Sequence, residues 1–296
     1  MHDPQAELIK LKREHEFLVA IDSDGCAFDT MEIKHKECFI PNIVRYWNLQ
    51  SSSKYAREAA EFVNLYSKWR GLNRFPALIM VFDLLKEWPE VQKRQAVIPE
   101  ATSLRQWIES ESNLSTQALK VKVETIGDKI LAQALEWSEA INRSVGEIVH
   151  GVPPFPHVRA SLEKLSQWAD IIVCSATPHE ALKREWDEHD LSQFVRVIAG
   201  QEMGSKREHI HLAAEGRYNR DKVIMIGDAL GDLEAARKNR ARFYPINPGG
   251  EEQSWEHLLN EAADRFRKGT YKGDYEDQLI TVFENLLPSI PPWKTN

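Results

Sequence analysis

The chain has 296 residues, of which 42% are hydrophobic and 28% are charged, and its formal net charge at pH 7 is −7. This composition excludes a disordered chain, and the acidic balance argues against a general nucleic-acid binder, because such proteins concentrate Lys and Arg. The longest apolar run, residues 77–82, is too short to cross a bilayer, and residues 1–16 lack the apolar core of a signal peptide. The three cysteines are widely spaced, which suits thiols kept reduced. We therefore expect a cytoplasmic protein with no membrane or nucleic-acid partner.

Short apolar segments in two parts of the chain predict the strands of a parallel sheet. They are apolar throughout instead of alternating, as in strands buried on both faces, and each is followed by a loop and a helical pattern. The segments are 17–21, 171–174, 194–198 and 223–226, with a weaker fifth at 242–246. This alternation predicts an α/β fold with a doubly wound parallel sheet, whose functional site lies at the carboxyl ends of the strands.

Residues 31–150 show helical periodicity and almost no strand signal, which predicts an inserted all-helical domain. Candidate helices there are 31–47, 56–69, 77–88, 103–110 and 128–148. The proline-rich segment 151–156 returns the chain to a helix at 158–168, and helices at 255–267 and 275–287 follow the last strand. The predicted domains are an α/β core of residues 1–30 and 151–296 and a helical domain of residues 31–150.

Two acidic residues, Asp22 and Asp24, directly follow the first predicted strand, in the segment Asp22-Ser-Asp-Gly25. Both carboxylates should emerge at the edge of the sheet while Ser23 points away, and Gly25 permits a sharp turn. A strand that ends in a polar turn is an equally good interpretation of this segment alone. An EF-hand fits poorly, because Cys26 stands where an oxygen ligand is required.

A second acidic pair, Asp228 and Asp232, follows the strand at 223–226 in the segment Gly227-Asp-Ala-Leu-Gly-Asp232. Alone, it is equally well interpreted as a helix N-cap with an acid in the first turn. Together, the two pairs bring several carboxylates to one edge of the sheet, where repulsion must be relieved by protonation or by a hard cation. We favour Mg²⁺ as the cofactor.

Two polar residues follow the remaining strands. Ser175 ends the second strand, where its hydroxyl and the following amides can bind an anion, although a turn or a helix cap explains it as well. Lys206 follows the third strand in Gly204-Ser-Lys206, and a lone lysine is usually a surface group. The position of Lys206 in the order of motifs is what makes it a candidate.

This ordered set resembles the haloacid dehalogenase-like hydrolase superfamily, whose four motifs correspond here to Asp22-Ser-Asp-Gly25, Ser175, Lys206 and Gly227-Asp-Ala-Leu-Gly-Asp232. The helical insert falls where the first type of cap domain of the family goes. The resemblance implies a Rossmann-like core with a helical cap. Two departures, Cys26 in place of the usual Thr and Arg207 in place of the usual Pro, touch fine positioning more than chemistry.

The resemblance also implies a role for each motif residue. Asp22 is the implied nucleophile, and Asp24 is the implied general acid and base. Mg²⁺ is expected between Asp22, the Asp24 backbone carbonyl and Asp228, with Asp232 in support. Ser175, Ala176 and Lys206 are expected to bind the phosphoryl oxygens. An acid at position 24 favours phosphate esters, because the halide-releasing and phosphonate-cleaving branches of the family lack it.

Within the predicted cap, the segment from Trp69 to Phe75 resembles the specificity loop of the β-phosphoglucomutase and phosphatase-like group. The implied substrate contacts are Arg70, Gly71, Asn73 and Arg74, and the alternative is an ordinary turn with solvated arginines. We predict a magnesium-dependent phosphatase that hydrolyses small phosphorylated metabolites through an aspartyl-phosphate intermediate. The alternatives are a phosphomutase acting on a sugar phosphate and a non-catalytic binding protein of the same superfamily.

Overall fold

The computed structural model describes residues 3–294, which separate into two compact units. One unit contains the residues up to Thr30 together with Gly151–Leu287, and the other contains Met31–His150 together with the residues from Pro288 onward. The sequence-based prediction instead assigned the residues after Leu287 to the α/β core. The chain therefore passes between the two units three times.

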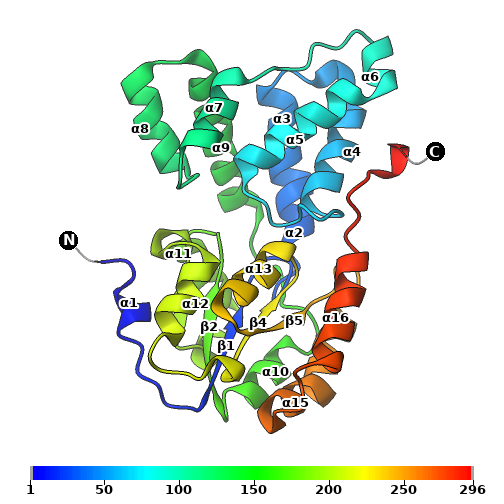
Figure 1. The fold of residues 1–296 in the computed structure, drawn as a ribbon. Helices are drawn as coiled ribbons and strands as arrows, with labels where there is room; N and C mark the ends of the chain where they lie inside the picture. The colour runs from blue at the N-terminus through cyan, green and yellow to red at the C-terminus, as the bar shows by residue number, and fades with distance from the viewer. Residues whose placement is uncertain (1–2, 295–296) are drawn as a thin grey trace. The chain divides into compact units, whose positions relative to one another are not determined.

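A five-stranded parallel sheet forms the centre of the α/β unit (Figure 1). Its strands are β1 (Phe17–Ile21), β2 (Ala169–Cys174), β3 (Val197–Ala199), β4 (Val223–Gly227) and β5 (Arg242–Pro245), in the spatial order β3-β2-β1-β4-β5. The last residue of β1, Ile21, pairs with Val173 of β2 and with Ile226 of β4. The residues that follow these three strands therefore emerge together at one edge of the sheet.

Helices cover both faces of this sheet, because consecutive residues of each strand point to opposite faces. Phe17, Val19 and Ile21 pack on one side, and Leu18 and Ala20 pack on the other. The first face is covered by α10 (Val158–Leu165), α11 (His179–Glu188), α14 (Glu251–His257) and α15 (Ala263–Lys268); the second face is covered by α1 (Ala6–Ile9), α12 (Lys206–Ala214), α13 (Leu230–Asn239) and α16 (Asp274–Asn285). The predicted doubly wound parallel sheet is confirmed.

The predicted strands agree with the observed ones to within one residue except at β2, which starts two residues earlier at Ala169, and at β3. Residues Ser192–Phe194 form a 3₁₀ turn, and the strand starts only at Val197. The Phe194 ring packs against the hydrophobic core from this turn. Phe194 was therefore mistaken for a strand residue, although it contributes to the core from the segment before the strand.

The helical unit contains no strand in residues 31–150, as predicted. A nearly continuous helical run comprises α2 (Thr30–Ile33), a π-helical stretch (Lys34–Phe39) and α3 (Ile40–Tyr46), and it is followed by α4 (Ser53–Asn64), α5 (Arg74–Glu87), α6 (Pro89–Lys93), α7 (Thr102–Ser110), α8 (Thr116–Ile126) and α9 (Lys129–Ile148). A separate core with the fully buried Trp47, Trp107 and Trp137 holds this unit together. Helices α6 and α8 were not predicted. Helix α6 is short and starts at a proline, and Leu119 is the one residue of α8 that is buried.

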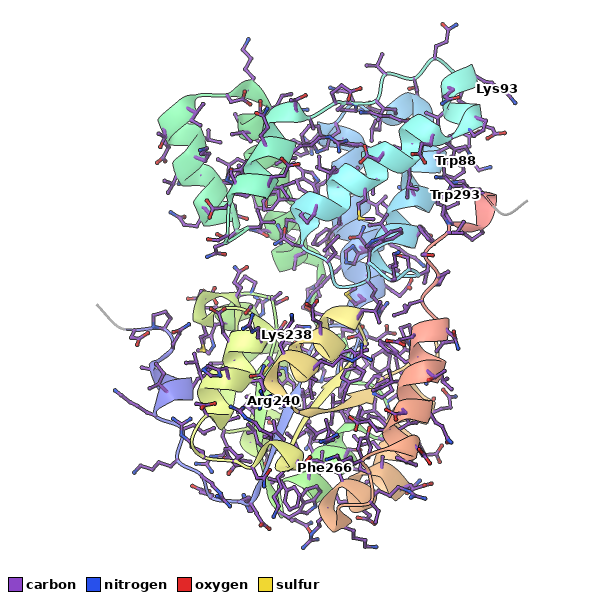
Figure 2. All side chains as sticks on the ribbon, viewed as in Figure 1. Trp88, Lys93, Lys238, Arg240, Phe266 and Trp293 are labelled. Atoms are coloured by element: carbon purple, nitrogen blue, oxygen red, sulfur yellow. The ribbon has the colours of Figure 1, made fainter. Side chains whose placement is uncertain are left out.

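The C-terminal segment packs on the helical unit. The Trp293 ring stacks on Trp88 with a centroid separation of 4.1 Å and an interplanar angle of 11° (Figure 2), and it also contacts Phe62. The Lys68 backbone N–H donates a hydrogen bond of 3.2 Å to the Pro288 carbonyl. Its neighbour Leu287 is buried in the α/β unit, so these two consecutive residues are anchored in different units.

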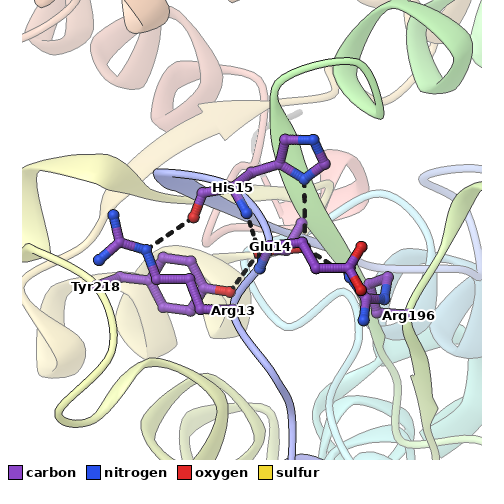
Figure 3. A network of polar contacts seen from close by, with 6 residues as sticks. Arg13, Glu14, His15, Arg196 and Tyr218 are labelled. Carbon is purple, nitrogen blue, oxygen red and sulfur yellow. Dashed lines mark hydrogen bonds and ion pairs between the residues drawn. The ribbon is translucent and has the colours of Figure 1, made fainter.

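At the amino edge of the sheet, a buried carboxylate near the start of β2 gathers several donors (Figure 3). Asp170 accepts hydrogen bonds from the backbone N–H groups of Glu14 (3.0 Å) and His15 (2.9 Å), from the Tyr218 hydroxyl (2.7 Å) and from Arg196 (3.0 Å). Burial alone would raise the pKa of Asp170, but hydrogen bonds from the His15 backbone, Tyr218 and the Glu14 backbone outweigh it, and the pKa is lowered. This cluster fixes the segment that leads into β1.

Two further sequence-based expectations concern the whole chain. Among the described residues, every helix is too short or too polar to span a bilayer. The cysteines Cys26, Cys38 and Cys174 are free and buried, so no disulfide joins them.

Candidate active site

Four of the predicted site residues meet at the carboxyl edge of the sheet. Asp22 follows β1, Asp228 follows β4, Lys206 is the first residue of α12, and Asp232 lies in the first turn of α13. The Lys206 ammonium nitrogen is 2.7 Å from Asp22 Oδ2 and 2.6 Å from Asp232 Oδ1. One carboxylate oxygen from each of the three aspartates lies within 4.8 Å of the others. Segments distant in sequence thus form one compact charged cluster.

The sheet itself holds Asp22 in place. The Asp22 backbone N–H donates to the Ile226 carbonyl (3.0 Å), and the Ser23 N–H donates to Asp22 Oδ1 (2.8 Å). The Ser23 side chain turns away from the cluster, as the strand pattern predicts. Its hydroxyl donates to Glu185 and accepts from the Trp186 indole N–H, each at 3.0 Å. Asp22 is therefore fixed with one carboxylate oxygen facing Lys206.

Charge in this cluster is unbalanced, because one ammonium faces three buried carboxylates. Burial raises the pKa of Asp22 well above its ordinary value; Lys206 lowers it, and Asp232 and Asp228 raise it further. Burial likewise raises the pKa of Asp232 against the opposing effect of Lys206. For Lys206, burial acts to lower the pKa, but Asp22 and Asp232 outweigh it and raise it. A hard divalent cation with oxygen ligands fits this surplus of buried negative charge.

The approach of Asp232 to the cluster requires a glycine at position 227. A Cβ atom on Gly227 would lie 2.4 Å from the Asp232 Cβ and 2.5 Å from its Oδ2. The same Oδ2 accepts a hydrogen bond of 3.1 Å from the Ala229 N–H, which caps α13, while Oδ1 pairs with Lys206. Asp232 therefore caps the helix with one carboxylate oxygen and contacts Lys206 with the other.

Asp24 is held by two hydroxyl groups that the sequence did not point to. Gly25 has φ of +75°, and its N–H donates to the Phe28 carbonyl, so the chain turns sharply after Asp24 as predicted. Thr30 donates to Asp24 Oδ1, and Thr177 donates to Oδ2 at 2.7 Å. Serine and threonine are common in turns, so neither residue carried a signal in the sequence.

Ser175 lies at the end of the neighbouring strand, as predicted. It is buried, its N–H donates to the Ala199 carbonyl (3.0 Å), and its hydroxyl accepts from the Thr177 N–H (3.1 Å). Ala176 next to it is exposed. The strand register places this turn beside Asp22, because Val173 pairs with Ile21. The Ser175 and Thr177 N–H groups are thus engaged within the protein, and the Ser175 hydroxyl and the Ala176 N–H are the donors of this turn that could contact an anion.

The predicted cap-loop residues make hydrogen bonds within the helical unit. Arg70 is buried and donates to the Leu65 carbonyl (3.0 Å). Gly71 adopts φ of +75°. Asn73 caps α5 by accepting from the Phe75 N–H at 3.0 Å.

Arg74 is tied to helix α9. It donates to the Ser138 carbonyl (3.1 Å) and to Asn142 (2.8 Å), and it lies over the Phe39 ring. Each residue of the loop thus has a local structural role, and contact with a substrate stays a prediction.

Comparison with known families places these motifs in context. Residues 90–246, more than half of the chain, match the family model of haloacid dehalogenase-like hydrolases. The matched range contains Ser175, Lys206, Asp228 and Asp232, whereas Asp22 lies outside it and joins the site through the fold. No curated protein matches the chain.

Several solved structures are similar to the chain at low sequence identity. A haloacid dehalogenase-like hydrolase from Streptococcus pneumoniae has 15% identity and a TM-score of 0.43, covering 83% of this chain and 91% of that one. A predicted phosphatase from Clostridium acetobutylicum has 15% identity and a TM-score of 0.44, covering 86% and 98%. The magnesium-bound YfnB from Bacillus subtilis has 12% identity and a TM-score of 0.47, covering 83% and 100%.

Proposed function

The chain belongs to the haloacid dehalogenase-like hydrolases, and from this premise we propose that it is a magnesium-dependent phosphatase. Its proposed substrates are small phosphorylated metabolites, which it would hydrolyse through an aspartyl-phosphate on Asp22. The observation that supports this most is the cluster itself. Asp22 is buried, presents Oδ2 to Lys206 at 2.7 Å and shares the carboxyl edge of the sheet with Asp228 and Asp232. A second carboxylate, Asp24, stands two residues away on a sharp turn.

In the proposed reaction, a carboxylate oxygen of Asp22 attacks the phosphorus atom of the ester. The bond from phosphorus to the leaving oxygen breaks, and Asp24 gives its proton to that oxygen, which leaves as an alcohol. Asp24, now ionised, takes a proton from a water molecule that attacks the phosphorus of the aspartyl-phosphate. Inorganic phosphate leaves, and both aspartates return to their starting states.

The residues present fit Mg²⁺, because buried carboxylate oxygens are the ligands it prefers. Asp22, Asp228 and the Asp24 backbone carbonyl would hold it, and Asp232 would support them. When bound, Mg²⁺ would offset negative charge on the phosphoryl group and on the carboxylates.

The phosphoryl oxygens need donors that are already oriented. Lys206 is fixed between Asp22 and Asp232, and the turn after β2 would contribute the Ser175 hydroxyl and the Ala176 N–H. Lys206 also compensates for charge that gathers in the transition state. In the helical unit, Arg70, Gly71, Asn73 and Arg74 remain the predicted substrate contacts.

The test is a screen of small phosphate esters with and without Mg²⁺, with release of inorganic phosphate as the measurement. We expect turnover that requires Mg²⁺ and falls by about 10³-fold or more in Asp22→Asn. Asp274→Asn, at an exposed position on α16, is the matched control and should retain full activity. Near-normal turnover by Asp22→Asn would refute the nucleophile, and isomerisation of a sugar phosphate without phosphate release would indicate a mutase.

A further inference from the structure

Asp24 differs from the other site acids because hydroxyl groups contact both of its carboxylate oxygens. Thr30, six residues further along the chain at the start of α2, contacts Oδ1. Thr177, 153 residues away in sequence, contacts Oδ2 at 2.7 Å. A hydroxyl on each of the two oxygens holds the plane of the carboxylate. The orientation of Asp24 therefore depends on a residue from a different strand end.

The turn after β2 holds Thr177 rigidly. The Thr177 N–H donates to the Ser175 hydroxyl (3.1 Å), and the Thr177 carbonyl accepts from the Gln201 N–H (3.1 Å). Ser175 itself is anchored to β3 through the Ala199 carbonyl. A single short turn thus carries a candidate phosphate-binding residue and, two positions later, the hydroxyl that contacts the acid.

We propose that Thr177 is a positioning residue that sets the place of Asp24 relative to the phosphoryl group, and this inference rests on the proposed phosphatase function. Ser175 and Thr177 belong to one turn, so the distance between the phosphoryl oxygens and the acid is fixed by local backbone geometry. A threonine hydroxyl both donates and accepts, so it keeps contact with Asp24 whether that group is protonated or ionised. Thr177 has no part in breaking or forming bonds.

The position of the acid affects the rate of ester cleavage only when the leaving oxygen must be protonated as it departs. A leaving group that departs as a stable anion should be cleaved at nearly the same rate when the acid is displaced. Phenyl phosphate and p-nitrophenyl phosphate separate these cases, since their rings are similar and p-nitrophenolate leaves easily without a proton. We expect Thr177→Val to lower kcat/KM for phenyl phosphate by about 10-fold or more and kcat/KM for p-nitrophenyl phosphate by less than about 3-fold. The ratio kcat/KM is the quantity to compare, because it reports the steps up to departure of the leaving group and excludes hydrolysis of the aspartyl-phosphate, which is common to both esters. Thr177→Ser, which keeps the hydroxyl, should restore kcat/KM for phenyl phosphate.

Thr281→Val, at an exposed position on α16, controls for a general effect of the substitution. Equal losses on the two esters, or no rescue by Thr177→Ser in a variant that folds normally, would overturn the role of Thr177 while leaving the phosphatase proposal intact. If the unaltered protein with Mg²⁺ hydrolyses neither these esters nor any ester of the screen, both proposals fail.

Discussion

Two buried aspartates at opposite ends of the same sheet show how surroundings decide what a carboxylate does. Asp22 at the carboxyl edge is 5% exposed, and Asp170 at the amino edge is 1% exposed. Burial, with the neighbouring Asp232 and Asp228, raises the pKa of Asp22 in spite of Lys206. Burial acts in the same direction on Asp170, but there the donors outweigh it and lower the pKa.

The difference between the two lies in the partners, since the burial is alike. Asp170 receives donors from Glu14, His15, Arg196 and Tyr218, which leave little need for another ligand. The Asp22 cluster brings three buried carboxylates together around one ammonium, so like charges lie close to one another. A buried carboxylate that is fully satisfied is structural, and one placed among like charges is a candidate for function.

The largest effect on stability is expected from Asp170→Asn. The amide cannot accept from all these donors and cannot balance Arg196, so we expect the unfolding free energy to fall by about 3 kcal/mol. Asp22→Asn should not lower it in metal-free buffer, because the substitution removes one of three mutually repelling carboxylates. Urea denaturation of the two variants measures this, and an equal loss in both would remove the distinction drawn between the two ends of the sheet.

A smaller effect, on activity, is expected from Gly227→Ala. The added Cβ would stand 2.4 Å from the Asp232 Cβ, so Asp232 must move away from Lys206. A displacement of this kind should lower kcat/KM by about 10²-fold. Gly231→Ala is the matched control in the same motif, because nothing lies within 4 Å of its added Cβ. Similar activities of the two variants would show that Asp232 need not be held where it is.

Most of the fold follows from the sequence, because buried parallel strands and amphipathic helices leave periodic patterns. The expected second strand nevertheless began at Ile171, after Asp170, since an acid argues against a strand buried on both faces. Hydrogen bonds offset the cost of burying Asp170 in this strand. They come from the segment before β1, from Arg196 and from Tyr218. The sequence also did not predict that the segment after Leu287 belongs to the helical unit. A proline-rich segment whose one aromatic residue is Trp293 has no pattern that identifies the helix on which it packs.

The order of the motifs along the chain was enough to predict part of the candidate site. Asp22, Lys206 and the pair Asp228 and Asp232 were predicted because they follow three different strands, and parallel strands end at one edge. Thr177 was missed, since a hydroxyl that reaches across 153 residues has no periodicity or spacing to reveal it.

A still smaller loss is expected from Tyr218→Phe, which removes one donor from Asp170 and leaves the ring in place. The hydroxyl donates at 2.7 Å to a buried charged acceptor, so its loss should lower the unfolding free energy by about 2 kcal/mol. In the double variant with Asp170→Asn, the two losses should not add, because both remove the same hydrogen bond. Full additivity in urea denaturation would show that the Tyr218 hydroxyl stabilises the protein independently of Asp170.

The smallest expected effect is the pH dependence of the stability that Asp170 contributes. The folded pKa of Asp170 lies below its ordinary value of 3.8, so the stability it contributes is complete above that value and is lost as pH falls through the lower folded value. The amide that replaces this carboxyl group in Asp170→Asn does not titrate. The difference in unfolding free energy between the unaltered protein and Asp170→Asn should therefore be constant between about pH 6 and about pH 4 and should shrink below about pH 4. Other carboxylates titrate in both proteins and cancel in this difference, so a gap that persists to about pH 3 would mean that the donors around Asp170 stabilise its neutral form as well.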